Sequence, residues 1–255
     1  RFFDPIRSLT IQYSMMQRAM VSGQHILEVL DVPEAIKDVP DALDLKQCAG
    51  GISFRNVDFA YASNTPVLTD INFTVSPGEK VAIVGATGSG KSTIAALLRR
   101  FYDVNSGKVL IDEHDIRNLS QSSIGRHVAM VLQDPFLFSG TILDNIRYSS
   151  LGKSAGDIEA AARAVGAHDF IMRLPGGYQY QVDQRGGNLS LGQRQLLSFA
   201  RALVKNTQIL ILDEATANVD SYSEMKIQKA LNILLQGRTA IVIAHRLATI
   251  RECDR

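Results

Sequence analysis

One glycine-rich run limits the possible folds of this chain more than any other feature, and it reads Gly85-Ala86-Thr87-Gly88-Ser89-Gly90-Lys91-Ser92-Thr93. Its spacing is G-x-x-x-x-G-K-[ST], in which the glycines let backbone N–H groups turn toward a single anion. A helix that starts at the lysine directs its positive end at the same anion. Lys91 is expected to reach the β- and γ-phosphates of a nucleotide, and the Ser92 hydroxyl to bind Mg²⁺. The run therefore predicts a phosphate-binding loop between a strand and a helix.

The pattern around this loop predicts an α/β fold. An apolar run over 80–84 precedes it, and a helix is predicted from Lys91 to about Tyr102. The runs 209–212 and 240–244 are apolar throughout, which is typical of parallel strands covered on both faces. Further strands are predicted over 109–111 and 128–132, and further helices over 157–173 and 191–204.

By pattern, the chain divides into three segments. Over 1–30, apolar residues recur at steps of three and four, which predicts a helix from about residue 6 with one apolar stripe. The segment 31–51 is polar and punctuated by proline and glycine, so we expect a linker there. A globular domain is predicted over 52–255, and it opens with short β-rich runs typical of antiparallel strands.

Composition excludes several classes of protein. The chain has 27 Lys and Arg against 26 Asp and Glu, too even a balance for a surface that neutralises nucleic-acid phosphates. It has no run of about 18 apolar residues that would span a membrane, and Cys48 and Cys253 lie outside any metal or redox spacing. It starts at Arg1 and stops at Arg255 soon after an apolar run, so we expect a fragment of a longer protein.

Two carboxylates supply the second part of the predicted site. Asp213 and Glu214 follow the apolar run 209–212, and a buried strand would deliver them at the sheet edge where ligands bind. Asp213 is expected to hold Mg²⁺ through water. Glu214 is then placed to polarise the attacking water as a general base or orienter.

The segment Asn188-Leu189-Ser190-Leu191-Gly192-Gln193-Arg194-Gln195 opens a predicted helix, with Ser190 as a plausible N-cap. It resembles the signature motif of ABC-type ATPases, L-S-G-G-Q. The phosphate loop, Asp213-Glu214 and His245 occur in the matching order, and the resemblance covers nearly the whole chain. The segment 134–146 resembles the exporter branch of that family. The resemblance implies a mainly parallel P-loop NTPase core, an antiparallel β subdomain and a helical signature subdomain.

This resemblance implies a domain that hydrolyses ATP in pairs. Each ATP would lie between one domain's phosphate loop and the signature helix of a second nucleotide-binding domain, contacting Ser190, Gly192 and Gln193. The second domain would be identical or a paralogue. The N-terminal helix resembles the end of an exporter's last membrane helix, which implies a transmembrane domain in the same polypeptide. The domain would then work at the cytoplasmic face of the cell membrane, and we expect no nucleic-acid partner.

The resemblance implies roles for four more residues. Tyr61 resembles the aromatic residue that stacks on adenine, and Gln133 resembles the glutamine that senses Mg²⁺ and the attacking water. Asp220 resembles the aspartate that links the two sites, and would contribute to the nucleotide site. His245 resembles the histidine that contacts the γ-phosphate and positions Glu214 and water.

Two positions depart from the family's pattern. Leu191 replaces the usual middle glycine of the signature, and we expect binding across the dimer to persist with an altered fit. Gln184 stands where exporter relatives often carry glutamate, which puts a contact to the membrane domain in doubt but not the ATP chemistry.

The run Phe136-Leu137-Phe138 follows Gln133 in a predicted loop. Because exposed apolar patches usually mark interfaces, we predict that these three side chains form one and receive a short helix from a transmembrane partner. The prediction fails if all three are buried in the domain's own core.

Two other functions are weighed against an exporter. A soluble mechanical ATPase of the same superfamily, acting in DNA repair or translation, would carry long coiled coils or two ATPase units, and neither is visible. A phosphotransferase would leave the segment Ser190–Gln193 unexplained. The transported substrate cannot be read from this chain, because selectivity would lie in the membrane domain.

Overall fold

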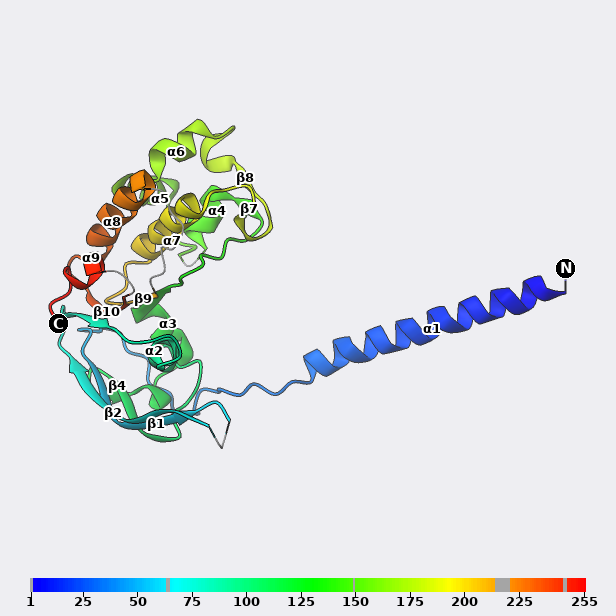
Figure 1. Cartoon of the computed structure of the whole chain (residues 1–255), viewed down its shortest axis with the longest axis horizontal. Coiled ribbons are helices and arrows are strands. Elements are labelled where there is room, and N and C mark those ends of the chain that lie inside the picture. The colour runs from blue at the N-terminus through cyan, green and yellow to red at the C-terminus, as the bar shows by residue number, and fades with distance from the viewer. Residues whose placement is uncertain (1, 63–64, 149, 214–220, 245–246) are drawn as a thin grey trace. The chain divides into compact units, whose positions relative to one another are not determined.

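In the computed structural model, the described residues are 2–62, 65–148, 150–213, 221–244 and 247–255. The chain forms two compact units, residues 1–37 and residues 38–255. Figure 1 shows the first as a single helix and the second as a mixed α/β domain. Each unit is described by itself below.

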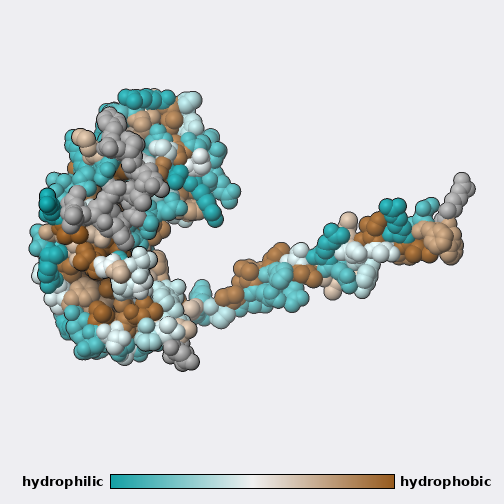
Figure 2. Space-filling view, in the orientation of Figure 1, coloured by the Kyte–Doolittle hydropathy of each residue, from teal (hydrophilic) through white to brown (hydrophobic). Residues whose placement is uncertain are grey.

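The first unit is the helix α1 (Phe3–Leu30), three residues longer at its start than predicted. No residue of it is buried, and Figure 2 shows its hydrophobic and hydrophilic side chains side by side along its length. A helix gains most of its stability from packing an apolar face, and this unit offers α1 no such partner. None of the described helices combines the length and the hydrophobicity that a membrane span requires.

The second unit opens with an antiparallel sheet, as predicted. Its strand order is β2-β1-β4-β5, formed by β1 (Ile52–Ala60), β2 (Pro66–Val75), β4 (Ser106–Ile111) and β5 (His114–Asp115). One face of this sheet is apolar: Phe54, Val57 and Phe59 on β1 are buried. Phe54 also stacks on Phe73 of β2, with ring centroids 4.6 Å apart.

A parallel sheet forms the centre of this unit. Its order is β3-β10-β9-β6, formed by β3 (Lys80–Ile83), β10 (Thr239–Ile243), β9 (Ile209–Asp213) and β6 (Val128–Val131). Ile209 and Ile211 pack into one apolar core, whereas Leu210 and Leu212 pack into a second core on the other face. Because side chains alternate along a strand, a strand that feeds two cores must be apolar at every position. The prediction from the continuous apolar runs is confirmed.

Helices cover both faces of this sheet, and Figure 1 shows α4 to α7 gathered at the end of the unit away from β1, β2 and β4. The helices are α2 (Lys91–Leu98), α3 (Gln121–His127), α4 (Ile142–Arg147), α5 (Ala155–Ala164), α6 (His168–Arg173), α7 (Leu191–Lys205), α8 (Ser221–Leu235) and α9 (Leu247–Ile250). β7 (Gly140–Thr141) and β8 (Gln181–Val182) pair as a short antiparallel two-stranded sheet, with α4, α5 and α6 between them in the sequence.

Two of the predicted helices have different limits in the structure. The single helix expected over 157–173 is wrong, because α5 and α6 are separated at Gly166, which has a φ of +72°. A residue in that left-handed region ends a helix, and glycine adopts it without strain. The helix that follows the phosphate loop ends at Leu98 rather than near Tyr102, and Arg100 has a φ of +55°.

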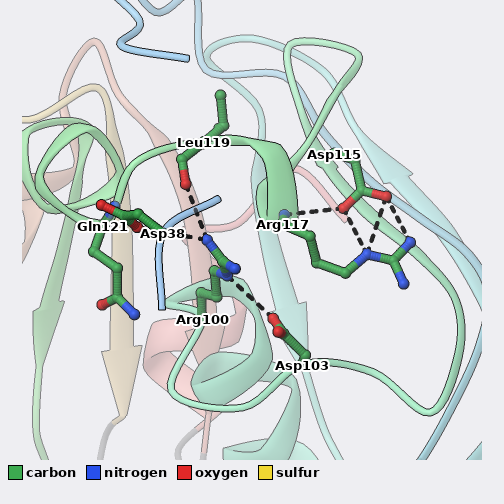
Figure 3. A network of polar contacts seen from close by, with 7 residues as sticks. All are labelled: Asp38, Arg100, Asp103, Asp115, Arg117, Leu119 and Gln121. Carbon is green, nitrogen blue, oxygen red and sulfur yellow. Dashed lines mark hydrogen bonds and ion pairs between the residues drawn. The ribbon is translucent and has the colours of Figure 1, made fainter. Parts of the chain in front are cut away.

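The position of Arg100 explains why α2 ends early. Its buried guanidinium donates to the carbonyl of Leu119 at 3.0 Å and to the Asp103 carboxylate at 3.1 Å (Figure 3). It also lies 3.8 Å from Asp38, whose carboxylate accepts the backbone N–H of Gln121. This network holds the first residue of the second unit against the end of α2. The compact unit therefore starts at Asp38, inside the expected linker.

A single carboxylate fixes the end of the expected linker. Asp112, in the turn between β4 and β5, accepts the backbone N–H groups of Ala49, Gly50 and Gly51 at 2.6, 3.0 and 2.6 Å. Cys48 lies beside it, and burial together with the Asp112 carboxylate raises the pKa of the thiol to about 12. The Cys48 thiol therefore stays protonated near neutral pH and has the low reactivity of a structural cysteine.

We expect Asp112→Asn to lower the free energy of unfolding by about 1–3 kcal/mol, because asparagine offers only one acceptor oxygen and no charge to these three N–H groups. Asp112 has a φ of +47°, a conformation that asparagine also tolerates, so the backbone adds no strain. Urea denaturation at neutral pH measures the difference. Glu113→Gln is the matched control, since Glu113 forms an exposed ion pair with Arg55. Equal stability of the two variants would contradict this anchoring role.

Candidate functional site

The four parallel strands end at one edge of the sheet, and the predicted site residues follow those ends. The phosphate loop follows β3, Gln133 follows β6, and Asp213 is the last residue of β9. Ala244 follows β10 and donates its N–H to the carbonyl of Ile83 at 3.2 Å. Glu214, Asp220 and His245 lie outside the described residues.

The phosphate loop has the backbone expected from its glycines. Gly88 and Gly90 have φ values of +85° and +87°. A Cβ added at Gly90 would lie 2.6 Å from Leu68 Cδ2 of the antiparallel sheet, so no other residue fits there without a shift. Gly90 is also the N-cap of α2 and provides no capping side chain. The first N–H groups of α2 are therefore left for an anion to accept.

Lys91 lies across the loop. Its side chain is 7% exposed, and its ammonium donates to the carbonyls of Gly85 and Ala86 at 2.9 and 2.8 Å. The loop residues 85–89 are exposed. Among the described residues, the hydrogen-bond acceptors of this charge are both neutral carbonyls, and a phosphate oxygen would be a stronger partner.

The structure brings Ser92 and Asp213 together. Ser92 Oγ, in the first turn of α2, donates to Asp213 Oδ2 at 3.4 Å, although the two residues are far apart in the sequence. A hydroxyl and a carboxylate beside a phosphate loop are the donor set that Mg²⁺ takes when phosphate oxygens and water complete its shell. No cluster of three His, Cys, Asp or Glu occurs among the described residues, and such a magnesium site does not need one.

Tyr61 lies immediately after β1 and beside the first turn of α2. Its hydroxyl is 3.1 Å from Thr93 Oγ1, and its ring is 55% exposed. Phe59 and Tyr102 contact it edge to face, with centroids 4.9 and 5.0 Å away. An exposed ring fixed by two aromatic neighbours is suited to stacking on a planar base. Tyr102 is a residue of this cluster that sequence reasoning missed.

The predicted signature helix is α7, and Ser190 is its N-cap, as expected. Ser190 Oγ accepts the N–H of Gln193 at 3.2 Å, and Gln193 Oε1 accepts the N–H of Ser190 at 2.9 Å, which completes a capping box. Gly192 is buried, and Leu191 is partly buried in the first turn. Among the described residues, no hydrogen bond joins this segment to the phosphate loop of the same chain.

The predicted apolar patch is only partly present. Phe136 and Phe138 are 45% and 39% exposed and meet edge to face, whereas Leu137 is fully buried in the domain core. The expectation is therefore wrong for Leu137, because alternate residues of an extended segment point to opposite sides. Gln184, the other departure from the family pattern, is exposed in a short turn.

A partly buried arginine holds this loop, and the sequence pattern did not reveal it. Arg201 of α7 donates to the carbonyls of Phe136 and Asn145 at 3.1 and 2.8 Å. Asn145 in turn accepts the N–H of Phe138 and donates to its carbonyl, both at 2.9 Å. An arginine between Ala200 and Ala202 in the predicted helix over 191–204 was the signal available in the sequence.

A groove of about 290 Å³ lies beside Phe136, and we name it the α2–β6–α7 groove. Its walls are the residues after α2, the strand β6 and its following loop, and the last two turns of α7. Its lining residues are Arg99, Phe101, Val128, Ala129, Met130, Leu132, Pro135, Phe136, Ser198, Arg201, Ala202 and Lys205.

Comparison with known proteins agrees with this geometry. Residues 68–217 match the family model described as "ABC transporter". The chain is 46% identical over 253 residues to the "ATP-dependent lipid A-core flippase" of Syntrophus aciditrophicus, covering 99% of this chain and 42% of the relative. It is 42% identical over 254 residues to the "Fatty acid ABC transporter ATP-binding/permease protein" of Mycobacterium bovis, covering 100% of this chain and 40% of the relative.

Among solved structures, the chain is similar to a bacterial Atm1-family ABC exporter with ATP bound. The TM-score is 0.84 and the sequence identity is 40%, over 99% of this chain and 44% of the exporter chain. The chain therefore spans less than half the length of these relatives.

Proposed function

The chain belongs to the ABC transporter family, and we propose from this that it binds and hydrolyses ATP to power export by a membrane transporter of which it is one part. The single observation that carries the proposal is the approach of Ser92 Oγ to Asp213 Oδ2, 3.4 Å apart, at the phosphate-loop end of α2. A hydroxyl, a carboxylate and a buried ammonium at one helix N-terminus suit a nucleotide triphosphate with its cation.

In this proposal, the loop residues 85–93 surround the phosphates with backbone N–H groups, and Tyr61 stacks on the adenine. The Lys91 ammonium leaves the carbonyls of Gly85 and Ala86 for the β- and γ-phosphates. These carbonyls lie in an exposed loop, so water replaces the lost donor. The exchange favours binding because the ammonium meets a full negative charge on the phosphate in place of a neutral carbonyl dipole.

Ser92 and Asp213 would hold Mg²⁺, Asp213 through a water molecule, and Gln133 would reach the same site from the end of β6. When bound, the ion would neutralise charge that develops on the transferred phosphoryl group. Glu214 would orient and deprotonate the attacking water, and His245 would contact the γ-phosphate. In the sequence, both residues come within two positions of the ends of β9 and β10, which supports these roles.

Each site would be completed by a second nucleotide-binding domain. Ser190 is exposed at the start of α7 and, within the part of the chain that the structure describes, forms no hydrogen bond with the phosphate loop, which supports a ligand held by another copy. Gly192 and Gln193 would approach that ATP with Ser190, and Asp220 would link the two sites. ATP would then act as a bridge that closes the pair before hydrolysis.

The transmembrane part of the polypeptide would lie before residue 38, with α1 as its last helix. We propose that one of its cytoplasmic segments docks in the α2–β6–α7 groove beside Phe136. The apolar lining and the exposed rings of Phe136 and Phe138 support this interface. The domain would therefore work at the cytoplasmic face of a membrane.

The proposal is tested by phosphate release from ATP. We expect hydrolysis that requires Mg²⁺, stops with EDTA, and rises in rate per protein molecule with protein concentration, because two chains complete each site. Phosphoryl transfer to an acceptor in place of phosphate release would overturn the proposal. A rate per molecule that does not change with concentration would overturn the paired site.

Ser190→Ala is expected to lower the free energy of unfolding by about 1 kcal/mol through loss of the N-cap, and also to abolish ATP-dependent dimerisation. ATP binding to a single chain should persist. The matched control is Ser154→Ala, which removes a capping box of the same form on α5. It should cost similar stability and leave dimerisation unchanged, as measured by sedimentation with and without ATP. Equal dimerisation by the two variants would contradict the role of Ser190.

A further inference from the structure

The α2–β6–α7 groove has an unusual set of charges. Its charged lining residues are Arg99, Arg201 and Lys205, and none of its described lining residues is acidic. The acidic residue nearest in sequence to its wall is Asp134, whose side chain is 87% exposed and lies 3.9 Å from Arg194 Nη2. The groove therefore presents three positive charges and, within the described chain, no carboxylate.

These three cations differ in what they already bind. Arg201 makes its hydrogen bonds to Phe136 and Asn145, all to neutral oxygens. The Arg99 guanidinium lies 5.9 Å from the centre of the Phe101 ring. Within the described residues, Lys205 and Arg99 form no ion pair with a carboxylate. Arg201 thus has a structural role that uses its donors, whereas the charges of Lys205 and Arg99 remain uncompensated.

Grouping like charges in a half-buried apolar site has a cost. Burial lowers the pKa of Arg99 and of Arg201, and burial together with the charge of Arg99 lowers the pKa of Lys205 to about 8. Like charges at short range repel, and the repulsion grows as water is removed. An anion placed between them would remove both the repulsion and part of the desolvation cost.

We propose that the segment docking in the α2–β6–α7 groove presents a glutamate or aspartate carboxylate to Lys205 and Arg99. The inference rests on the proposed function, since it specifies the chemistry of the docking segment. The remaining lining, which includes Met130 and Leu132, is mostly apolar. The occupant must therefore bury hydrocarbon as well as charge, which favours a peptide with an apolar residue beside its acidic residue over a free inorganic anion.

The test uses two short helical peptides that differ only in a central Glu or Gln, each flanked by Phe and Leu. They are titrated into the full chain and followed by NMR. We expect the Glu peptide to shift the signals of Met130 and Ala202 and to bind about tenfold more tightly than the Gln peptide, the size of one added charged hydrogen bond. The Glu peptide should also raise the pKa of Lys205 by about one to two units, and the Gln peptide should not.

Variants link the effect to the groove. Lys205→Met should remove the preference for Glu over Gln, and the exposed-site control Lys153→Met should retain it. Lys205→Glu should lose affinity for the Glu peptide and gain affinity for a peptide with a central Lys. This reversal cannot arise from a variant that fails to fold.

Each remaining outcome overturns the inference in a distinguishable way. Equal binding of the Glu and Gln peptides at the groove would disprove the need for a carboxylate and leave groove docking intact. Inorganic phosphate that raises the pKa of Lys205 as much as the Glu peptide would identify a free-anion site instead. No shift at the groove with any peptide would disprove docking there. ATP is added to the same sample in that case. Shifts of the phosphate-loop signals would show that the chain still binds nucleotide although no peptide docks in the groove.

Discussion

Replacing Glu214 with glutamine is expected to slow ATP turnover by about two to four orders of magnitude, the range that a general base contributes. Glutamine keeps the size of the side chain and cannot accept a proton from the attacking water. Phosphate binding through Lys91 and the loop does not involve this carboxylate, so ATP affinity should persist. Because ATP would bridge two chains until it is hydrolysed, the variant should accumulate as a closed dimer.

Phosphate release and sedimentation in the presence of Mg²⁺ and ATP measure the two effects. The control is Glu159→Gln on α5, where the exposed carboxylate pairs with Arg163 and His168 at the helical end of the unit. It should leave both turnover and oligomeric state unchanged. Unchanged turnover in Glu214→Gln would show that another group activates the water.

Replacing Lys91 with methionine is expected to weaken ATP binding about 100-fold or more, because each charged hydrogen bond to phosphate contributes about 1.5–3 kcal/mol. Methionine fills a similar volume without charge. The carbonyls of Gly85 and Ala86 lose a donor, but they lie in an exposed loop where water can replace it. The fold should therefore survive, and the increase in thermal stability that saturating ATP produces should disappear.

Calorimetric titration of ATP measures this affinity, and circular dichroism confirms the fold. Lys108→Met removes an exposed ammonium from β4 and serves as the control, with no expected change in affinity. Lys91→Arg separates charge from shape, since arginine keeps the charge and adds bulk where the native side chain is buried. Full ATP affinity in Lys91→Met would exclude the proposed role of the ammonium.

Local sequence pattern predicted several structural elements around the candidate site. The continuous apolar runs at 209–212 and 240–244 predicted buried parallel strands, since a strand with two covered faces has no polar position. These strands alone predict Asp213 at the sheet edge beside the phosphate loop. The contact between Asp213 and Ser92 agrees with this predicted position. Ser190 was expected to cap a helix because its hydroxyl can bond the N–H three residues ahead, a contact that spans only one turn.

Prediction failed where the deciding contact was distant in the chain. The end of α2 depends on Arg100, which donates a hydrogen bond to Leu119. The periodic pattern of apolar residues in the helix carries no information about this distant contact. The segment 38–51 has the composition of a linker, but Asp112 and the Arg100 network bind it to the domain. Leu137 was expected in an exposed patch, and its burial is set by the core it meets rather than by its neighbours in sequence.

The amino-acid sequence by itself determined the phosphate loop, the strands that flank it, the capped start of α7 and the order of the site residues. Each of these depends on backbone preferences and side-chain periods that act within a few residues. Only the tertiary structure decided that Ser92 meets Asp213, that Asp112 anchors the residues before β1, and that Arg99 and Lys205 share one groove whose described lining residues include no carboxylate. Those arrangements arise when separate elements pack on a common sheet, and the distances between their side chains are set by that packing alone.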